Sequence, residues 1–185
     1  DVDAVVIATP VSTHYDLAYR ALRHKKHVLV EKPLCDSSEK VQHLVNTAAE
    51  DGLTLMVDHT FLYTGAIQKI KSLIDSDELG DVFYYDSVRV NLGLFQHDVD
   101  VMWDLAVHDL SIMDHLIKTK PKRVSATGIQ HLEDQQVNMA YMTLDFGDSM
   151  VAHLHVNWLA PVKIRRTLIG GSKKINSYSF FHPIK

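Results

Sequence analysis

The stretch His27-Val-Leu-Val-Glu31-Lys32-Pro33 decides the fold that this sequence predicts. Three strand-forming residues in a row indicate a short buried strand, which runs directly into two opposite charges and a proline. Pro33 cannot donate a ladder hydrogen bond and favours an extended Lys32, so the strand ends with the lysine at its tip. On these residues alone two interpretations stand: a surface ion pair that contributes little, or a functional lysine.

Two further apolar runs, residues 4–8 and 53–57, place this strand in a parallel sheet, because helical patterns separate the three runs. Strand, helix and strand in that order form a right-handed unit with parallel strands. The segments that follow the strands are Thr9-Pro10, Glu31-Lys32-Pro33 and Asp58-His59-Thr60. Since ligands bind outside the carboxyl ends of parallel strands, we favour the functional interpretation of Lys32.

Capping patterns predict where the two intervening helices begin. Thr13 and Asp16 fit a capping box for the first helix, and Asp36 and Glu39 fit one for the second. Gly52 is placed to end the second helix.

From Phe61 onward the pattern changes to long alternating segments. Residues 82–92 alternate throughout, and four further segments indicate antiparallel strands: 123–129, 138–146, 150–159 and 164–169. The fold class predicted is α/β: residues 1–60 form the second half of a Rossmann-type parallel sheet, and residues 61–185 an α+β domain with a large, mostly antiparallel sheet. The pattern is lost from Asn176 onward, where we expect an irregular end.

Composition excludes several classes of protein. The chain has 185 residues, 46% of them hydrophobic and 23% charged, as in a soluble globular protein. A net charge of -4 without a long basic run argues against a nucleic-acid partner or a membrane surface. No apolar run approaches the roughly 20 residues that cross a bilayer. The single cysteine, Cys35, excludes an internal disulfide, so we expect a cytoplasmic protein, and no zinc motif predicts a metal site.

A second candidate site lies on a helix predicted over residues 101–117, which is apolar around most of its circumference and therefore buried. Its polar residues follow at spacings of four, three and four, which puts them on one narrow stripe: Asp104, His108, Ser111 and His115. The stripe faces either solvent or a polar cleft. We favour a cleft because a carboxylate one turn before an imidazole can orient it, as a general base requires.

These elements together resemble the glucose-fructose oxidoreductase, inositol dehydrogenase and rhizopine-catabolism family (Gfo/Idh/MocA). The resemblance rests on Ala8-Thr9-Pro10, Glu31-Lys32-Pro33 and Asp104-Leu-Ala-Val-His108-Asp109 in this order, and it covers the chain to about residue 174. It implies an oxidoreductase that transfers hydride between NAD or NADP and a hydroxyl of a sugar or sugar nucleotide. It also implies a homo-oligomer assembled through the antiparallel sheet.

The resemblance also implies a role for each motif. Lys32 is similar to the family's lysine beside the nicotinamide and the substrate hydroxyl, His108 to its catalytic acid/base, and Asp104 to its supporting or substrate-binding carboxylate. These roles suit the chemistry, because alcohol oxidation needs a base within reach of the hydroxyl and a cation near the developing alkoxide. The other residues implied to bind the cofactor are Ala8, Thr9, Pro10, His14, Glu31 and Pro33.

Three stretches resemble one branch of the family, which oxidises UDP-N-acetylhexosamines or their uronic acids at C3 in surface-polysaccharide biosynthesis. They are Phe61-Leu-Tyr63, Val90-Asn-Leu-Gly93 and residues 155–165. The residues implied to bind substrate are Tyr63, Asn91, Trp103, Lys163 and Arg165. The cations Lys163, Arg165 and Arg166 either meet a diphosphate, which suits the planar fork of arginine, or form a solvated strand edge.

The sequence departs from the family's pattern in two respects. Its eight glycines contain no Gly-x-Gly-x-x-Gly turn, which holds the pyrophosphate. We therefore expect a fragment that lacks the first half of its cofactor domain, binds NAD(P) weakly or not at all, and is inactive by itself. Ala106 and Ser111 stand where the family often has glycine and aspartate. Two alternatives remain: a non-catalytic oligomerisation or sugar-binding module, and a decayed, inactive homologue.

Overall fold

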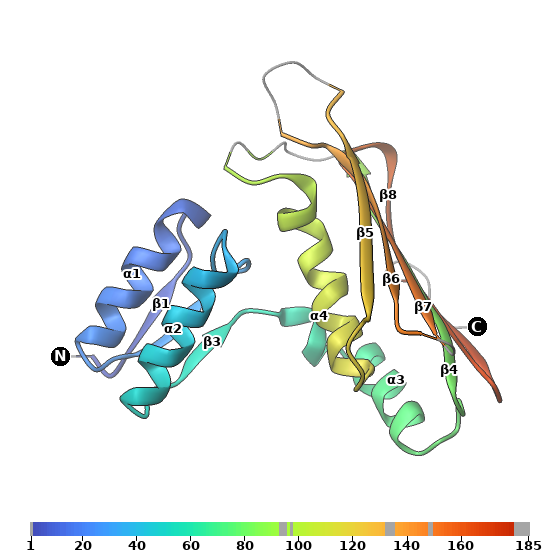
Figure 1. Cartoon of the computed structure of the whole chain (residues 1–185), viewed down its shortest axis with the longest axis horizontal. Coiled ribbons are helices and arrows are strands. Elements are labelled where there is room, and N and C mark those ends of the chain that lie inside the picture. The colour runs from blue at the N-terminus through green and yellow to red at the C-terminus, as the bar shows by residue number, and fades with distance from the viewer. Residues whose placement is uncertain (1, 93–95, 97, 132–135, 148–149, 180–185) are drawn as a thin grey trace. The chain divides into compact units, whose positions relative to one another are not determined.

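The computed structural model describes the chain except for residues 1, 93–95, 97, 132–135, 148–149 and 180–185 (Figure 1). The chain separates into two compact units, Asp1–His59 and Thr60–Lys185, called unit 1 and unit 2 below. Each unit is described by itself. The predicted fold class, a Rossmann-type parallel sheet followed by a mostly antiparallel sheet with helices, is confirmed.

Unit 1 is a three-stranded parallel sheet with two helices (Figure 1). Its strands are β1 (Ala4–Ile7), β2 (His27–Val30) and β3 (Leu55–Val57), in that spatial order. The helices α1 (Val11–Arg23) and α2 (Ser38–Glu50) connect them. Apolar residues at helical spacing pack against the strands and form the core: Ile7, Ala18, Leu22, Val28, Val30, Leu44 and Ala48.

Both helices begin at other residues than the capping patterns predicted. Helix α1 begins at Val11, directly after Pro10, whose φ of -57° already has the helical value. Thr13 therefore lies inside the first turn, where its hydroxyl donates to the carbonyl of Pro10 at 2.8 Å. In α2 the capping residue is Ser37, whose side chain accepts from the backbone N–H of Lys40.

Unit 2 contains a six-stranded sheet with the order β5-β6-β7-β4-β8-β9. The strands are β4 (Val82–Leu92), β5 (Arg123–Ile129), β6 (Met139–Asp145), β7 (Val151–Asn157), β8 (Leu159–Gly171) and β9 (Ile175–Ser179). Neighbouring strands are antiparallel except β4 and β7, which pair in parallel. The irregular end expected from Asn176 is wrong for the described residues, because β9 pairs with β8 through Ser179.

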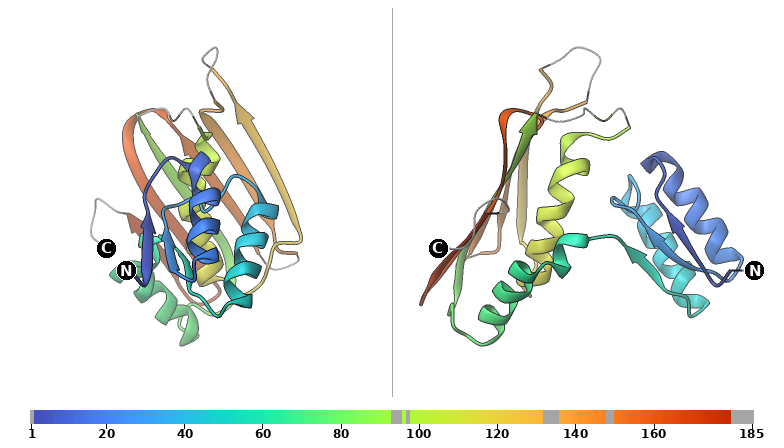
Figure 2. Two further views of the ribbon diagram at one scale, coloured as in Figure 1. Left: turned by 90° about the vertical axis from the view of Figure 1, so that its left-hand side faces the viewer. Right: turned by 180° about the vertical axis from the view of Figure 1, so that it is seen from behind.

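Helices lie along one face of this sheet (Figures 1 and 2). They are the 3-10 helix η1 (Thr60–Tyr63), α3 (Gly65–Asp75), the π-helix η2 (Met102–Ala106) and α4 (Val107–Leu116). The core between helices and sheet contains large buried side chains: Ile67, Tyr85, Ile112, Leu116, Leu154, Trp158 and Ile169. We call this side of the sheet the covered face. The other side, the open face, carries no helix within the described part of unit 2.

The helix predicted over residues 101–117 consists of two different segments. Asp100 Oδ1 accepts from the backbone N–H groups of Met102 and Trp103, at 2.9 and 3.0 Å, and caps the start. The first segment, η2, is a π-helix, which is wider than an α-helix because its hydrogen bonds span five residues. Asp104 therefore lies outside the α-helical stripe predicted for it, while His108, Ser111 and His115 keep their spacing on α4.

Candidate active site

The three strands of unit 1 end level with one another at one edge of the sheet. Val30 pairs with both Ile7 and Val57, so the residues after the strands start neighbouring loops. The backbone N–H of Glu31 donates to the carbonyl of Ile7 at 2.9 Å, and that of Asp58 donates to the carbonyl of Val30 at 2.8 Å. Lys32 is half-buried in the middle loop. Its place at the carboxyl edge of a parallel sheet is where such sheets bind ligands.

The side chain of His14 bridges the loop after β1 and the loop after β2. Its ring is only 1% exposed, with Nδ1 2.9 Å from the carbonyl oxygen of Pro33 and Nε2 2.8 Å from that of Thr9. A neutral imidazole donates from one of its two nitrogens at a time. The ring thus holds the loop after β1 against the loop after β2. The cofactor contact that the resemblance implies for His14 stays a prediction.

The other residues implied to bind the cofactor lie around this edge. Ala8, Thr9 and Pro10 are exposed in the first loop, at the N-terminus of α1, whose dipole favours negative charge. Glu31 is half-buried, and its carboxylate accepts from the backbone N–H of Lys32 at 3.3 Å. Pro33 is buried.

His59 is a titratable neighbour of Lys32 to which the sequence assigned no role. Burial lowers the pKa of its imidazole, the Asp58 carboxylate opposes this shift, and the positive charge of Lys32 lowers the pKa further. A neutral ring at pH 7 therefore stands within electrostatic reach of the lysine. Its position two residues after the third predicted strand was the only signal in the sequence.

In unit 2, His108 lies in the first turn of α4 and meets the ring of Phe61 from η1. The two ring centroids are 4.8 Å apart and the planes are inclined by 76°. The guanidinium carbons of Arg89 and Arg165 lie 4.5 and 5.6 Å from the centroid of the same phenyl ring. These arginines face each other across β4 and β8. The phenyl ring of Phe61 thus contacts the imidazole of His108 and lies beside two guanidinium groups on the covered face.

Asp109, the residue after His108, forms a buried ion pair with Arg89. Arg89 Nε donates to Asp109 Oδ2 at 2.7 Å and Nη2 donates to Oδ1 at 3.0 Å, a bidentate arrangement. The two side chains are 5% and 3% exposed. The sequence reasoning gave Arg89 no role, although a lone arginine in an alternating strand was a usable signal.

Asp104 is held by a residue from the junction of β7 and β8. The indole Nε1 of Trp158 donates to Asp104 Oδ2 at 3.0 Å, and the tryptophan is 1% exposed. A carboxylate that receives a hydrogen bond from a buried indole has a fixed orientation. Trp158 is therefore a further residue of this site that the sequence analysis did not single out.

The residues implied to bind substrate are distributed over several elements of unit 2. Tyr63 on η1 is 66% exposed, Trp103 on η2 is 39% exposed, and Asn91 near the end of β4 is half-buried. Gly93, which belongs to the same sequence stretch as Asn91, lies outside the described residues. Lys163 is exposed. Arg165 reaches Phe61 on the covered face, whereas Arg166 lines a hollow on the open face, so the two neighbours do not share one site.

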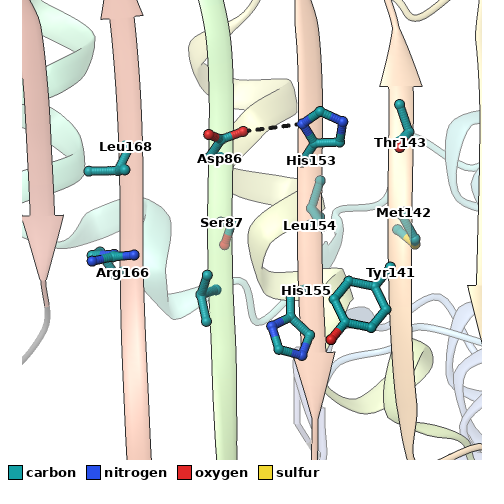
Figure 3. Close-up of a pocket in the computed structure, with 11 residues that line it drawn as sticks. Asp86, Ser87, Tyr141, Met142, Thr143, His153, Leu154, His155, Arg166 and Leu168 are labelled. Atoms are coloured by element: carbon teal, nitrogen blue, oxygen red, sulfur yellow. Dashed lines mark ion pairs between the residues drawn. The ribbon is translucent and has the colours of Figure 1, made fainter.

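That hollow has a volume of about 340 Å³ and lies over strands β4, β6, β7 and β8 (Figure 3). His153 Nδ1 is 3.4 Å from Asp86 Oδ1, and the rings of Tyr141 and His155 stack at 4.3 Å. Among the residues that the structure describes, no three His, Cys, Asp or Glu side chains gather to hold a metal ion. No helix in this part of the chain is long and apolar enough to cross a membrane.

Comparison with protein families matches both units. Residues 1–59 match the family model described as "Oxidoreductase family, NAD-binding Rossmann fold". Residues 67–175 match the model of the GFO/IDH/MocA C-terminal domain.

Individual relatives and solved structures agree with these matches. UDP-N-acetylglucosamine 3-dehydrogenase of Acidithiobacillus ferrooxidans is 32% identical over 98% of this chain and 57% of its own length. Its solved structure superimposes with a TM-score of 0.84, at 30% identity over 97% of this chain and 58% of that one. The NAD-dependent scyllo-inositol 2-dehydrogenase of Bacillus subtilis is 28% identical over 79% of this chain and 46% of its length.

One structure supports the fold alone, because its sequence identity is low. GenD2 from gentamicin A biosynthesis, solved in complex with NAD, has a TM-score of 0.90 at 23% identity, over 97% of this chain and 55% of that one. The chain spans about half the length of the curated relatives that it matches.

Proposed function

The chain belongs to the GFO/IDH/MocA family of oxidoreductases. We propose that it forms part of an NAD(P)-dependent dehydrogenase that oxidises a hydroxyl of a sugar or sugar nucleotide. The observation that carries this proposal is the position of Lys32 at the carboxyl edge of the parallel sheet. The imidazole of His108, set on a buried helix among fixed neighbours, supports it independently.

The proposed reaction gives each of three side chains a distinct task. His108 accepts the proton of the substrate hydroxyl as the carbon-bound hydrogen leaves as hydride, so it acts as general base. The ammonium of Lys32 stabilises the negative charge that develops on the hydroxyl oxygen. Asp104, oriented by Trp158, accepts a hydrogen bond from a neighbouring group of the substrate. In the reverse direction the same imidazole returns the proton.

The residues of unit 1 fit the nicotinamide cofactor at the edge where its strands end. NAD(P)⁺, when bound, supplies the hydride acceptor. Thr9 and Pro10 offer an exposed loop at a helix N-terminus, and Glu31 and Lys32 offer charged groups at the adjacent strand. The pyrophosphate-binding glycine turn is not among the glycines of this sequence. We therefore expect the chain by itself to bind NAD(P) weakly.

We infer that the substrate is a UDP-N-acetylhexosamine oxidised at C3. The named activity of the Acidithiobacillus ferrooxidans relative, UDP-N-acetylglucosamine 3-dehydrogenase, supports this choice. The exposed Lys163 and the partly exposed Arg165 supply positive charge from β8 for a diphosphate. The scyllo-inositol relative makes a cyclitol the competing substrate.

The test is a substrate panel with the protein expressed from its complete reading frame. NAD⁺ or NADP⁺ is supplied with UDP-N-acetylhexosamines, their uronic acids and inositols, and the absorbance of the reduced nicotinamide is followed. We expect reduction with a UDP-sugar and a loss of about 10² to 10⁴-fold in His108→Ala. Tight cofactor binding without reduction by any sugar would count against a dehydrogenase and favour the non-catalytic module or the decayed homologue.

The open face of the six-stranded sheet is the surface through which we propose a homo-oligomer. It exposes large apolar side chains, among them Tyr141, which is 50% exposed, and Ile164, which is 38% exposed. The hollow beside them offers a recess for side chains of a second copy. Light scattering should give a multiple of the monomer mass, which Tyr141→Glu should reduce. A monomer at all concentrations would refute this assembly.

A further inference from the structure

We propose that Arg89 is a positioning residue that sets the orientation of His108, acting through Asp109 and Phe61. The proposal deepens the function given above and rests on His108 being the general base. Arg89 itself is buried, at 4% exposed, and so acts only through its neighbours.

The first connection runs through the helix that carries His108. The bidentate pair between Arg89 and Asp109 fixes both the distance and the plane of the Asp109 carboxylate. Because Asp109 follows His108 directly in the first turns of α4, fixing one residue fixes the rotation of the helix at the other.

A second residue of β4 holds the same point of the helix. The hydroxyl of Tyr85, four residues before Arg89 on the same face of the strand, donates to the carbonyl oxygen of Asp109 at 3.1 Å. Tyr85 is fully buried, and burial together with the charge of Asp109 raises the pKa of its phenol, so it stays a donor. Asp109 is thus held by its side chain and by its backbone from one strand.

The third connection runs through Phe61 and reaches the imidazole itself. The guanidinium of Arg89 stacks 4.5 Å from the centroid of the phenyl ring, which in turn meets the His108 ring edge-on. The cation therefore fixes the phenyl ring that limits the rotation of the imidazole. Arg89 acts on His108 from the helix side and from the ring side.

Stability alone does not account for this pair. A buried ion pair costs desolvation, and well-packed apolar residues of similar volume often give equal or greater stability. Arg89 Nη1 is also buried without a hydrogen-bond partner among the described residues, which adds to that cost. The geometry that an arginine fork imposes is what apolar residues could not supply.

The experiment separates orientation from stability with a double variant. Arg89→Met or Asp109→Leu alone leaves a buried charge and should lower the melting temperature, whereas the two together remove both charges and should restore it. If the pair orients His108, the double variant should still lose about 100-fold in kcat, as misplaced catalytic groups do, with an unchanged KM for the cofactor. Arg89→Lys, which keeps the charge but not the fork, should fold and lose part of kcat.

A spectroscopic readout makes the test independent of turnover. The ring protons of His108, assigned by comparison with His108→Gln, should show in ¹H–¹³C spectra a ring-current displacement caused by Phe61. This displacement should be reduced in the double variant and in Arg89→Lys. The matched control is Lys120→Gln with Asp114→Asn, which removes an exposed ion pair between Asp114 of the same helix and Lys120 beyond its end, and should change neither kcat nor the signal.

The outcomes are distinct for the two proposals. Wild-type kcat with an unmoved His108 signal, in a folded double variant, would overturn the positioning role. If the double variant does not fold, wild-type kcat and an unmoved signal in Arg89→Lys would overturn it equally. If the wild-type protein reduces no nicotinamide with any sugar, the dehydrogenase proposal fails and the displaced signal alone decides the role of Arg89.

Discussion

Strand β4 carries an acid–base pair on each face of the same sheet, and the two pairs differ in how far they are removed from water. The pair on the open face is an ion pair only while His153 is protonated. On the covered face, Arg89 and Asp109 are 5% and 3% exposed and make two hydrogen bonds. On the open face, His153 and Asp86 are 57% and 43% exposed and meet at 3.4 Å. The two β4 members, Asp86 and Arg89, are three positions apart, so strand alternation alone sends one inward and the other outward.

Burial, more than the presence of opposite charges, decides what such a pair of side chains does. An exposed pair gains little, because water and salt screen it. A buried pair fixes geometry, and removing one partner leaves a charge without solvent. We propose that the covered pair positions His108, and the open pair lies on the surface through which we propose assembly.

The largest difference between the faces should appear when each carboxylate is neutralised. We expect Asp109→Asn to lower the free energy of unfolding by about 3–5 kcal/mol, since Arg89 is left buried and charged. Asp86→Asn, measured in the monomeric Tyr141→Glu background so that the proposed assembly does not cover the open face, should cost about 0–1 kcal/mol, since His153 remains solvated there. Urea denaturation with a common m-value measures both. Equal losses for the two variants would contradict the claim that burial decides how much each pair contributes to stability.

A smaller effect should follow from the hydrogen bond between Trp158 and Asp104 on the covered face. Trp158→Phe removes the indole donor and should lower the free energy of unfolding by about 1.5–3 kcal/mol, the range for hydrogen bonds to charged groups. Asp104→Asn keeps an oxygen acceptor for the indole and should cost less. Denaturant unfolding of both variants gives the order, and a larger loss for Asp104→Asn would contradict the assignment.

The smallest effect should be the pH dependence that the open face contributes through His155. Burial lowers the pKa of its imidazole below the usual value of about 6.5, so between the two values the unfolded chain binds more protons than the folded one. The free energy of unfolding therefore rises with pH in this window. The contribution is complete above about pH 6.5 and decreases as the pH falls through the window toward the folded-state pKa.

His155→Gln should flatten this slope in unfolding experiments between about pH 5 and 7. Tyr141→Phe, which keeps a ring stacked beside His155, is the control and should leave the slope unchanged. A slope that survives His155→Gln in full would show that other groups cause it.

Much of the fold follows from patterns that the sequence displays. Continuous apolar runs predicted the parallel strands, and alternation predicted β4 with its observed bounds. The helix starts were missed because Pro10 and Ser37, not Thr13 and Asp36, are the residues that precede the first helical turns. The π-helix before His108 was missed because no periodicity distinguishes a wider turn inside an apolar helix.

The candidate site was only partly predictable for a related reason. The motifs pointed to Lys32, Asp104 and His108, whose roles stay predictions. They did not point to Arg89 and Trp158, and they suggested a cofactor contact for His14 without its loop-bridging hydrogen bond to Pro33. Each of these contacts joins residues at least 19 positions apart in the chain, a separation at which local patterns carry no information.

By itself the sequence determined the two kinds of sheet, their order along the chain and the family resemblance, because these depend on local hydrophobic periodicity and short motifs. Only the tertiary structure decided which charges are buried. It put Arg89 and Arg165 on one face and Arg166 on the other, and it brought Phe61 between Arg89 and His108. The reason is physical: the strength of an electrostatic contact depends on its solvent exposure, and exposure is set by the packing of distant segments.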